Sequence, residues 1–494
     1  MGRQRANRGV VRLRLSRGRA GALLMAAVLL YGSATVSAQT GATPGPSTPG
    51  RAIPGALGGT PFSGSVPAKL VEGVVSLSLQ EAIDRGLKQN LGLLLSSADT
   101  NSARGQRWEQ LSALLPHVTA APSLADSEIN LAESGLTVIA GTIIPPSVGP
   151  FSYFDARVSV AQSLFDWKSI NAARAANQKV KSADFTYKNA RDLVVLAVGY
   201  LYLQAIADEA HVETAEAQVK AAQALYDQAS DQVTAGTSAD IDGLRAKVEL
   251  QTRQQQLIQS RNNLAIQKLT VARVVGLAPG QEFELTDKSP YQPFESMTVD
   301  EALKHAYGSR SDYQAAIAEV RTAEFSHKAA VAGYLPSLAL NANYGTAGGH
   351  ASTATQVFDV RGTLLIPIFL GGSVRGDILQ ADARLAQSAE RLDDLRAQID
   401  SDVRSSLLNL QSSADLVSVA RSNIQLAEQT LAQSSDRFSA GVADSVEVVQ
   451  SQETVASAHE QYISSLYSYN LAKVSLARAL GAAEEGVKEY FKGK

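Results

Sequence analysis

Hydrophobic positions recur every seven residues over two long stretches of the chain. The first stretch carries Val198, Ala205, Val212, Val219, Tyr226 and Val233 on one row, with Leu201, Asp208, Ala215, Ala222 and Ala229 beside it. The second carries Val403, Leu410, Val417, Ile424, Leu431 and Phe438, with Ser406, Ser413, Ala420, Ala427 and Ser434. Large residues on one row and small ones on the next let helices approach closely, as in coiled coils. We therefore expect helices over residues 168–233 and 373–438, each about 100 Å long.

Shorter helical patterns flank the long ones. Residues 79–114 and 299–334 each predict one helix that ends at a Leu-Pro pair, because proline disfavours helix in the residue before it. Glycine turns at Gly236 and Gly441 lead into helices that end at Gly276 and Gly481. The two short helices of each set together match the length of the long one, so we expect them to cover its flank.

Two segments alternate with a period of two instead. In FDARVSVAQSLF (154–165) and FDVRGTLLIPIF (358–369), apolar residues alternate with Asp155, Arg157, Asp359 and Arg361. This is the pattern of a transmembrane β-strand, which predicts that these four charged residues line a barrel lumen. They either pair with each other and stiffen the wall or tune ion preference. The alternation is weaker in HVTAAPSLADSEINL and SLALNANYGTAG, where a soluble hairpin stays an alternative.

The chain repeats itself. LQEAI at 79–83 matches VDEAL at 299–303, FDAR at 154–157 matches FDVR at 358–361, and ARVVGL around Gly276 matches ARALGA around Gly481. We expect a first repeat over 77–280, a linker over 281–298, a second repeat over 299–482 and a tail over 483–494.

Four strands per chain cannot close a barrel, and open sheet edges are not tolerated in lipid. Two copies supply eight strands, which side chains fill, whereas three supply twelve and leave an opening. The expected fold class is thus mainly α with a transmembrane β-barrel, closed as a trimer. After the N-terminal leader no uninterrupted run of 18 apolar residues occurs, so we expect no membrane-spanning helix.

The N-terminus has the composition of an export signal. Seven arginines precede the apolar run AGALLMAAVLLY (20–31), and the small residues of VSA (36–38) predict cleavage before Gln39. We expect a signal peptide over 1–38 and a flexible leader rich in glycine and proline over 39–76. The chain has no cysteine and a net charge of −3. No catalytic motif, metal-ligand cluster or cofactor-binding loop is recognisable, and no basic face indicates nucleic acid.

The strand-to-helix joint PIFLGGSVRGDILQADARL (367–385) resembles the outer membrane efflux protein family, the TolC-like channels. SAGVADSVEVVQSQ from Ser439 and TAGTSADIDGLRAK from Thr234 are similar to the helical tips of that family. The resemblance implies a trimer with a twelve-stranded outer-membrane barrel on a long periplasmic helical tunnel. It also implies a non-enzymatic exit duct that docks to a periplasmic adaptor and an inner-membrane transporter.

Carboxylates follow each tip turn, and two interpretations of them stay open. Asp444 and Glu447 have the spacing of a capping box, and acids suit a helix N-terminus. The family resemblance implies instead a periplasmic gate with acidic rings and a tyrosine-centred network. On that map the gate comprises Gly236, Asp240, Asp242, Phe438, Gly441, Asp444, Glu447 and Gln450. Phe438 takes the tyrosine position and Gln450 an acidic one, so the implied network is only partly kept.

Two further questions stay open. Phe165, Trp167 and Phe369 fall at the expected periplasmic edge of the membrane, either as interfacial anchors or as packing wedges. The alternative to a duct is a structural coiled-coil protein of the periplasm or cell surface, which would not need the alternation of residues 358–369. The exported substrate is not readable from these residues.

Overall fold

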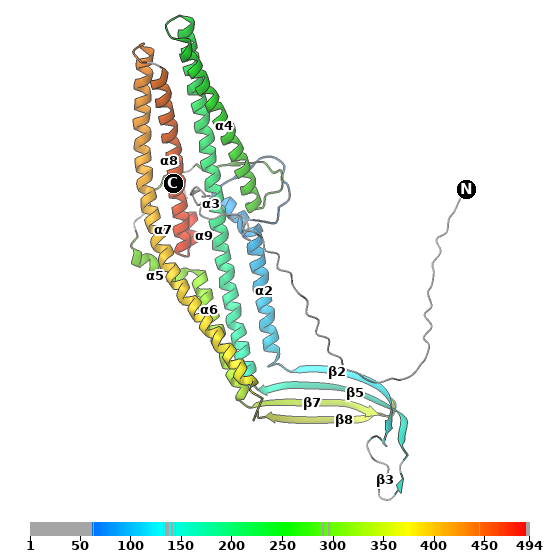
Figure 1. Ribbon diagram of the computed structural model, residues 1–494. Coiled ribbons are helices and arrows are strands. Elements are labelled where there is room, and N and C mark those ends of the chain that lie inside the picture. Colours follow the sequence, from blue (N-terminus) through cyan, green and yellow to red (C-terminus); the bar gives the residue numbers. More distant parts are fainter. Residues whose placement is uncertain are drawn as a thin grey trace, which may run out of the picture. The chain divides into compact units, whose positions relative to one another are not determined.

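Helices dominate the computed structural model, which describes residues 62, 64–131, 133, 138–139, 142–143, 145–288, 291–294, 297–443 and 445–490. The expected signal peptide (1–38) and cleavage site lie outside these residues. The long helices are α3 (Trp167–Thr234) and α7 (Ser373–Ser439). They are followed by α4 (Asp240–Val275) and α8 (Ser445–Ala479), and Figure 1 shows these helices running alongside one another.

Each expected short helix before a Leu-Pro pair is broken into two. The first gives α1 (Leu79–Gln89) and α2 (Leu91–Ser112), and the second gives α5 (Val299–Ser309) and α6 (Ser311–Val331), followed by a short 3-10 turn (Ala332–Tyr334). The prediction of single helices over 79–114 and 299–334 was wrong. Asn90 and Arg310 adopt extended backbone at the breaks, although neither residue type excludes helix.

Tertiary contacts explain both breaks. Asn90 caps α2 by accepting a hydrogen bond from the Gly92 N–H, and the Arg310 side chain binds carboxylates. The C-terminal ends of α4 and α8 pack closely on these breaks. A Cβ added at Gly481 would lie 2.6 Å from the backbone nitrogen of Arg310, so only glycine fits there.

The seven-residue pattern is confirmed as a packing pattern. Val403, Leu410, Val417 and Phe438 are buried on α7, and Ala215, Ala222 and Ala229 are buried on α3. In the half of the bundle away from the sheet, α4, α3, α8 and α7 pack side by side in that order, so α4 and α7 are the end helices of this upper row (Figure 1). In the half next to the sheet, α2, α3, α6 and α7 pack in that order and form a lower row, again with α7 at one end (Figure 1).

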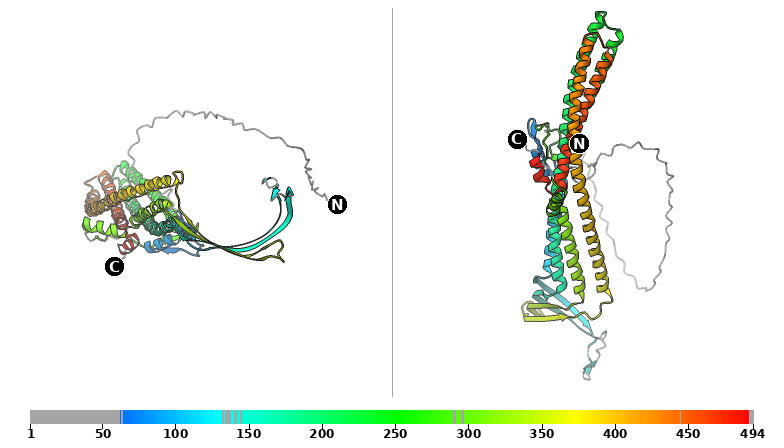
Figure 2. Two further views of the ribbon diagram at one scale, coloured as in Figure 1. Left: turned by 90° about the horizontal axis from the view of Figure 1, so that it is seen from below. Right: turned by 90° about the vertical axis from the view of Figure 1, so that its left-hand side faces the viewer.

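Four strands form one antiparallel sheet in the order β2-β5-β7-β8. They are β2 (His117–Asn130), β5 (Ser147–Phe165), β7 (Ser337–Gly348) and β8 (Thr355–Leu365). In the segment that connects β2 to β5, two short strands, β3 (Val138–Ile139) and β4 (Thr142–Ile143), pair with each other. The sheet is visibly curved when viewed along the helices (Figure 2). The weakly alternating segments thus belong to the same sheet as the strongly alternating ones.

Regular structure extends into the segments expected as leader, linker and tail. The strand β1 (Val75–Leu77) begins in the expected leader, and it pairs in parallel with β6 (Phe283–Leu285) inside the expected linker. The Tyr202 hydroxyl donates to the Leu77 carbonyl at 2.8 Å and ties this pair to α3. The expected tail forms α9 (Ala483–Tyr490), where Ala483 and Val487 are fully buried.

One described helix is long and apolar enough to cross a membrane by length and composition, which the sequence analysis did not expect. It is α3, whose most apolar 18-residue window has a mean hydropathy of 1.4 and is 56% buried inside the structure. Val194, Val198 and Tyr202 on α3 are fully buried in the largest hydrophobic cluster. The apolar window therefore serves the core of the helix bundle.

Candidate functional site

The strand register sorts side chains onto two faces of the sheet. Directly paired residues of antiparallel strands point to the same face. Asp155 pairs with Ala347, Asn343 with Asp359 and Asn341 with Arg361, which gathers the polar residues on one face. The opposite face carries a different set: Val118, Leu124, Phe154, Val158, Val160, Leu340, Tyr344, Phe358, Val360 and Leu364.

The charged pairs of the polar face bind each other. Asp155 and Arg157 form an ion pair at 2.8 Å, and the Tyr153 hydroxyl bridges them by donating to Asp155 and accepting from Arg157. Asp359 and Arg361 approach to 3.6 Å and are more exposed. This arrangement matches the wall-stiffening interpretation, because each carboxylate already has a cationic partner. The lumenal position of these residues stays a prediction.

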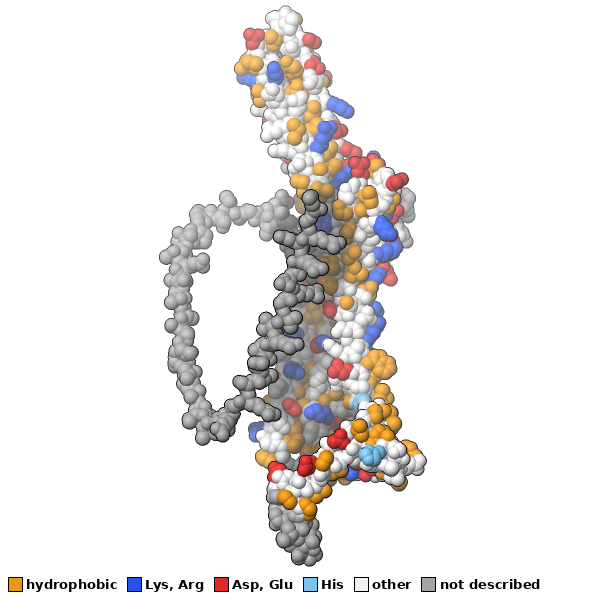
Figure 3. Space-filling model, turned by 90° about the vertical axis from the view of Figure 1, so that its right-hand side faces the viewer, with side chains coloured by type: hydrophobic (Ala, Val, Ile, Leu, Met, Phe, Trp, Pro, Cys, Tyr) orange, Lys and Arg blue, Asp and Glu red, His pale blue; other side chains and the backbone are white. Residues whose placement is uncertain are grey.

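The apolar face is uncovered within the described chain. Phe358 is 77% exposed, Val360 67% and Leu364 61%. Figure 3 shows hydrophobic side chains gathered where the helices meet the strands. Contiguous exposed apolar surface of this kind marks a contact with lipid or with another protein.

Both edges of the sheet are also open. β2 and β8 each pair on one side only, although they contain 14 and 11 residues. The two end helices of the upper row carry exposed apolar side chains as well, namely Leu244, Val248, Ile258 and Leu269 on α4 and Leu408, Leu416, Val419 and Leu426 on α7. Long unpaired edges are templates for pairing with another chain.

At the other end of the long helices, two turns form a tip. Gly236 follows α3 with φ +74°, and Gly441 follows α7 with φ +72°. This left-handed backbone favours glycine, so these residues set the reversal of each helix pair. Asp240 is exposed in the first turn of α4, and Asp444 lies outside the described residues.

Asp242 joins the two helix pairs of the tip. Its carboxylate accepts hydrogen bonds from the Ser445 hydroxyl at 2.7 Å and the Ser238 hydroxyl at 2.8 Å. Ser445 is the first residue of α8 and is fully buried. These hydrogen bonds, that of Ser445 first, hold the pKa of Asp242 below its usual range. Asp242 therefore connects α4 to α8. The sequence analysis did not identify Ser445 as its partner, because the two positions are 203 residues apart.

Phe438 packs inside the tip of one chain. It is 4% exposed and lies in a cluster with Leu225 and Ala229 of α3, Ala246 of α4 and Val448 of α8. One hydrophobic cluster at the tip thus contains side chains from all four helices. Val442, in the turn that follows α7, is by contrast 67% exposed.

The remaining tip residues lie along α8. Glu447 occupies its first turn and binds Arg437 of α7 at 3.3 Å between Oε1 and Nε. Gln450 is exposed and lines a groove of about 720 Å³ between α7 and α8, together with Glu453 and Thr454. The structure thus brings Asp242, Phe438 and Glu447 to one end of the bundle, as the turn positions predicted.

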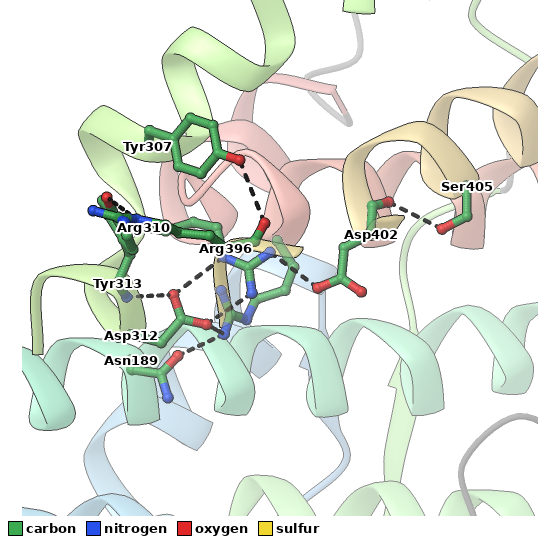
Figure 4. A network of polar contacts seen from close by, with 9 residues as sticks. Asn189, Tyr307, Arg310, Asp312, Tyr313, Arg396, Asp402 and Ser405 are labelled. Carbon is green, nitrogen blue, oxygen red and sulfur yellow. Dashed lines mark hydrogen bonds and ion pairs between the residues drawn. The ribbon is translucent and has the colours of Figure 1, made fainter. Parts of the chain in front are cut away.

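A polar network that the sequence analysis missed connects the helices in the middle of the bundle (Figure 4). Arg310, at the break between α5 and α6, donates to both carboxylate oxygens of Asp312 at 3.1 and 2.8 Å and to Asp402 of α7 at 3.0 Å. Arg478 of α8 donates to Asp312 at 3.1 Å and to Asn189 of α3 at 2.6 Å. One arginine–carboxylate network thereby joins both halves of the chain.

Two carboxyl groups in and beside this network have pKa values shifted in opposite directions. Burial alone raises the pKa of Asp312, but hydrogen bonds from Arg310 and the charge of Arg478 lower it to about 2. For Asp192 burial dominates over the attraction of Arg478 and raises the pKa to about 6. Beside it, Arg191 binds Glu484 of α9 at 2.7 Å. No signal in the sequence marked Asp192, because one buried Asp among apolar residues has no motif.

The described residues hold no group of three or more histidine or acidic side chains placed to bind a metal ion. The contacts described above connect helices to one another, and the sheet exposes an apolar face. This arrangement suits a structural wall.

Comparison with known proteins decides the family. The model of the family described as "Outer membrane efflux protein" matches residues 82–277 and 302–482. The chain belongs to the outer membrane efflux protein family. Its location is therefore the outer membrane, and its function is that of an efflux channel.

Its relatives in this family are distant in sequence. The outer membrane protein TolC of Escherichia coli is 22% identical over 346 residues, 67% of this chain and 70% of that protein. The alkaline protease secretion protein AprF of Pseudomonas aeruginosa is 22% identical over 354 residues, 68% and 71% of the two chains. The pyoverdine export outer membrane protein OpmQ of the same species is 23% identical and covers 78% and 83%.

Solved structures share the fold. The outer membrane protein VceC from Vibrio cholerae superposes with a TM-score of 0.72 at 18% identity, over 82% of this chain and 97% of that one. The Campylobacter jejuni CmeC outer membrane channel superposes with a TM-score of 0.71 at 16% identity, over 82% and 86%. At this identity the likeness concerns the fold alone.

Proposed function

We propose that three copies of this chain form an outer-membrane exit duct, which conducts substrates delivered by an inner-membrane transporter through a periplasmic adaptor. The four strands of each copy contribute to one twelve-stranded barrel, and the helices extend it into a tunnel. The two halves of the chain act as repeats of one unit. Each half supplies two strands to the barrel and one set of helices to the tunnel.

One observation carries the proposal. The open edges of the sheet and the end helices of the upper row come in matching pairs, with β2 and α4 from the first half and β8 and α7 from the second. A second copy that pairs its β8 with β2 also sets its α7 beside α4, which covers both apolar helix faces. Such a head-to-tail contact joins two different surfaces of the chain. Repeated around a closed ring of copies, it leaves no strand edge unpaired.

The two-faced sheet favours a duct over a structural rod. A rod in the periplasm does not need an apolar face of exposed Phe358, Val360 and Leu364 on a curved sheet, whereas a lipid-facing barrel wall does. The relatives TolC, AprF and OpmQ, two of them named for secretion or export, support a role in export. At the tip, Asp240 is exposed and supports cation attraction at the mouth, whereas Glu447 already has a cationic partner in Arg437.

Light scattering of detergent-solubilised protein tests the assembly. We expect a particle that contains three chains. A stable monomer would contradict both the barrel and the tunnel, because its sheet edges would have no partner. Resistance of the membrane-bound protein to carbonate extraction separates the duct from a periplasmic coiled-coil protein, which carbonate releases.

A further inference from the structure

Within one chain, the two halves meet where α3 packs against α8. Leu203 of α3 and Val474 of α8 are buried in one hydrophobic cluster there, at 3% and 0% exposure. Arg478 of α8 donates to the side-chain oxygen of Asn189 on α3 at 2.6 Å. The contact between the halves thus has an apolar part and a polar part.

The same positions are free on the two end helices of the upper row. A shift of 205 residues matches the C-terminal end of α4 to that of α8, and it also matches the heptads of α3 to those of α7. The shift relates Val474 to Leu269 of α4 and Leu203 to Leu408 of α7. Leu269 is 70% exposed and Leu408 is 68% exposed. The end helices therefore carry, uncovered, the apolar residues that the halves bury against each other.

The polar part of the contact also has a counterpart on the end helices. The same shift relates Arg478 to Arg273 of α4 and Asn189 to Asp394 of α7. Arg273 and Asp394 are both exposed, and neither forms an ion pair among the residues that the structure describes. A neutral partner inside the chain thus corresponds to a carboxylate on the free surface. An arginine–carboxylate hydrogen bond is stronger than one to a neutral oxygen.

Neighbouring charges on α7 already have partners on the same helix. Arg396 binds Asp393 at 2.8 Å, and Arg404 binds Asp400 at 2.8 Å. Asp394 lies between these two pairs along the helix. It is therefore a carboxylate of this surface that stays available to a neighbouring molecule.

On α4, Arg273 lies beside an open groove. Arg273 and Leu269 are four residues apart and line one groove of about 710 Å³ at the C-terminal end of the helix. Lys268, Glu282 and Glu284 line it as well, and no ion pair forms among the groove residues within the described chain. Residues four apart share one face of a helix. This face thus offers an apolar side chain and a free guanidinium group together.

We propose that Arg273 of each copy binds Asp394 of the next copy, and that this ion pair fixes the register in which the copies join midway along the helical tunnel. The inference rests on the proposed function, because it requires α7 of one copy to lie beside α4 of another. Apolar rows that repeat every seven residues still match after a slip of one heptad. Such a slip moves the two charges about 10 Å apart, so the ion pair disfavours it.

Cross-linking tests whether the two positions meet, because the natural chain has no cysteine. The full-length variant Arg273→Cys, Asp394→Cys is treated with a short bis-maleimide, which links only thiols that lie close together. The matched control combines Arg273→Cys with Asp415→Cys, an exposed position of α7 that lies 21 residues nearer the tip, about 30 Å away. We expect linked species of two and three chains from the first variant and single chains from the control.

Charge exchange tests whether the contact is an ion pair. Arg273→Glu should lower the temperature at which the trimer separates into single chains, since two carboxylates then face each other at every joint. Adding Asp394→Arg should restore most of the lost temperature. A defect confined to the end of α4 would not be repaired by a change on α7, so the restoration is specific to the pair.

Light scattering of the wild-type protein separates two failures. If the wild type is a trimer but the first variant links no more than the control, or the exchange restores nothing, the ion pair is wrong and the duct stands. If the paired cysteines themselves prevent assembly, the charge exchange decides. A wild type that forms no trimer contradicts the proposed function itself.

Discussion

Among single residues, Asp192 has an effect on stability that its burial dictates. Its pKa is about 6 in the folded protein, above the value of about 3.9 expected for an unfolded Asp. A carboxyl group whose pKa is raised on folding stabilises the protein while it is protonated. That stability is present below the unfolded pKa and is lost as the pH rises through 6.

Asp192→Asn should therefore stabilise the protein at pH 7.5, by up to about 3 kcal/mol for a shift of about two pKa units, and have little effect near pH 4. The measurement is the melting temperature of the detergent-solubilised protein at both pH values. Asp312→Asn is the matched control, since the lowered pKa of Asp312 predicts destabilisation at pH 7.5. Equal effects of Asp192→Asn at both pH values would contradict the assignment.

The contact between Asp242 and Ser445 makes a second residue-scale prediction. A hydrogen bond to a charged group contributes about 1.5–3 kcal/mol, so Asp242→Ala and Ser445→Ala should each destabilise the tip. The double variant should cost less than the sum of the two, as a double-mutant cycle in urea or by melting would show. Additive effects would mean that the two helix pairs are not coupled through this contact.

At the scale of elements, the faces of β8 are not equivalent. Val360 and Thr363 lie on opposite faces, three residues apart on one strand. Val360→Lys should reduce the share of protein that resists carbonate extraction, because a lysine facing the middle of the bilayer costs about 2–4 kcal/mol. Thr363→Lys, the matched control on the polar face, should leave that share unchanged. Equal loss in both variants would contradict the assigned faces.

The elements also show what pattern alone can predict. The period of seven located α3 and α7, and the period of two located β5 and β8, because each period follows from burying one face of a regular element. The breaks at Asn90 and Arg310 escaped prediction, since packing against the ends of α4 and α8 imposes them on sequences that would continue as helix. Residues 64–76 of the leader escaped too, because β1 gains its partner β6 from 208 residues away along the chain.

The candidate site was predictable only in part, because several of its contacts also join residues that lie far apart in the sequence. Turn glycines and acidic residues identify Gly236, Gly441 and Asp242 locally. The partners Ser445 and Val448 and the network around Arg310 exist only after distant helices meet. The heptad position of Phe438 predicts that it is buried, but not that residues of α3, α4 and α8 of the same chain join it in one cluster.

For the whole molecule, the direction of insertion can be tested at the turn between β7 and β8. This turn, which includes Ser352, lies at the end of the strands away from the helices. Ser352→Cys should label with a membrane-impermeant thiol reagent on intact cells, because we expect this turn to lie outside the cell. The label reports this position alone, since the natural chain has no cysteine. The control Val442→Cys, at the tip, should label only after the outer membrane is opened. The reverse pattern would invert the topology. The matching position Ser134, in the other loop, lies outside the described residues.

Single-channel recording in a planar bilayer tests the central claim, that the assembled protein is a conducting duct with its mouth at the helical tip. We predict discrete openings of low conductance with a preference for cations, since the tip carboxylates of the proposed trimer would surround its mouth and attract them. Replacing Asp444 and Glu447 together by Ala should weaken this preference. Phe438→Ala should raise the conductance by loosening the packed tip. Protein that inserts as a trimer but gives no discrete openings, in the wild type or in Phe438→Ala, would contradict the account.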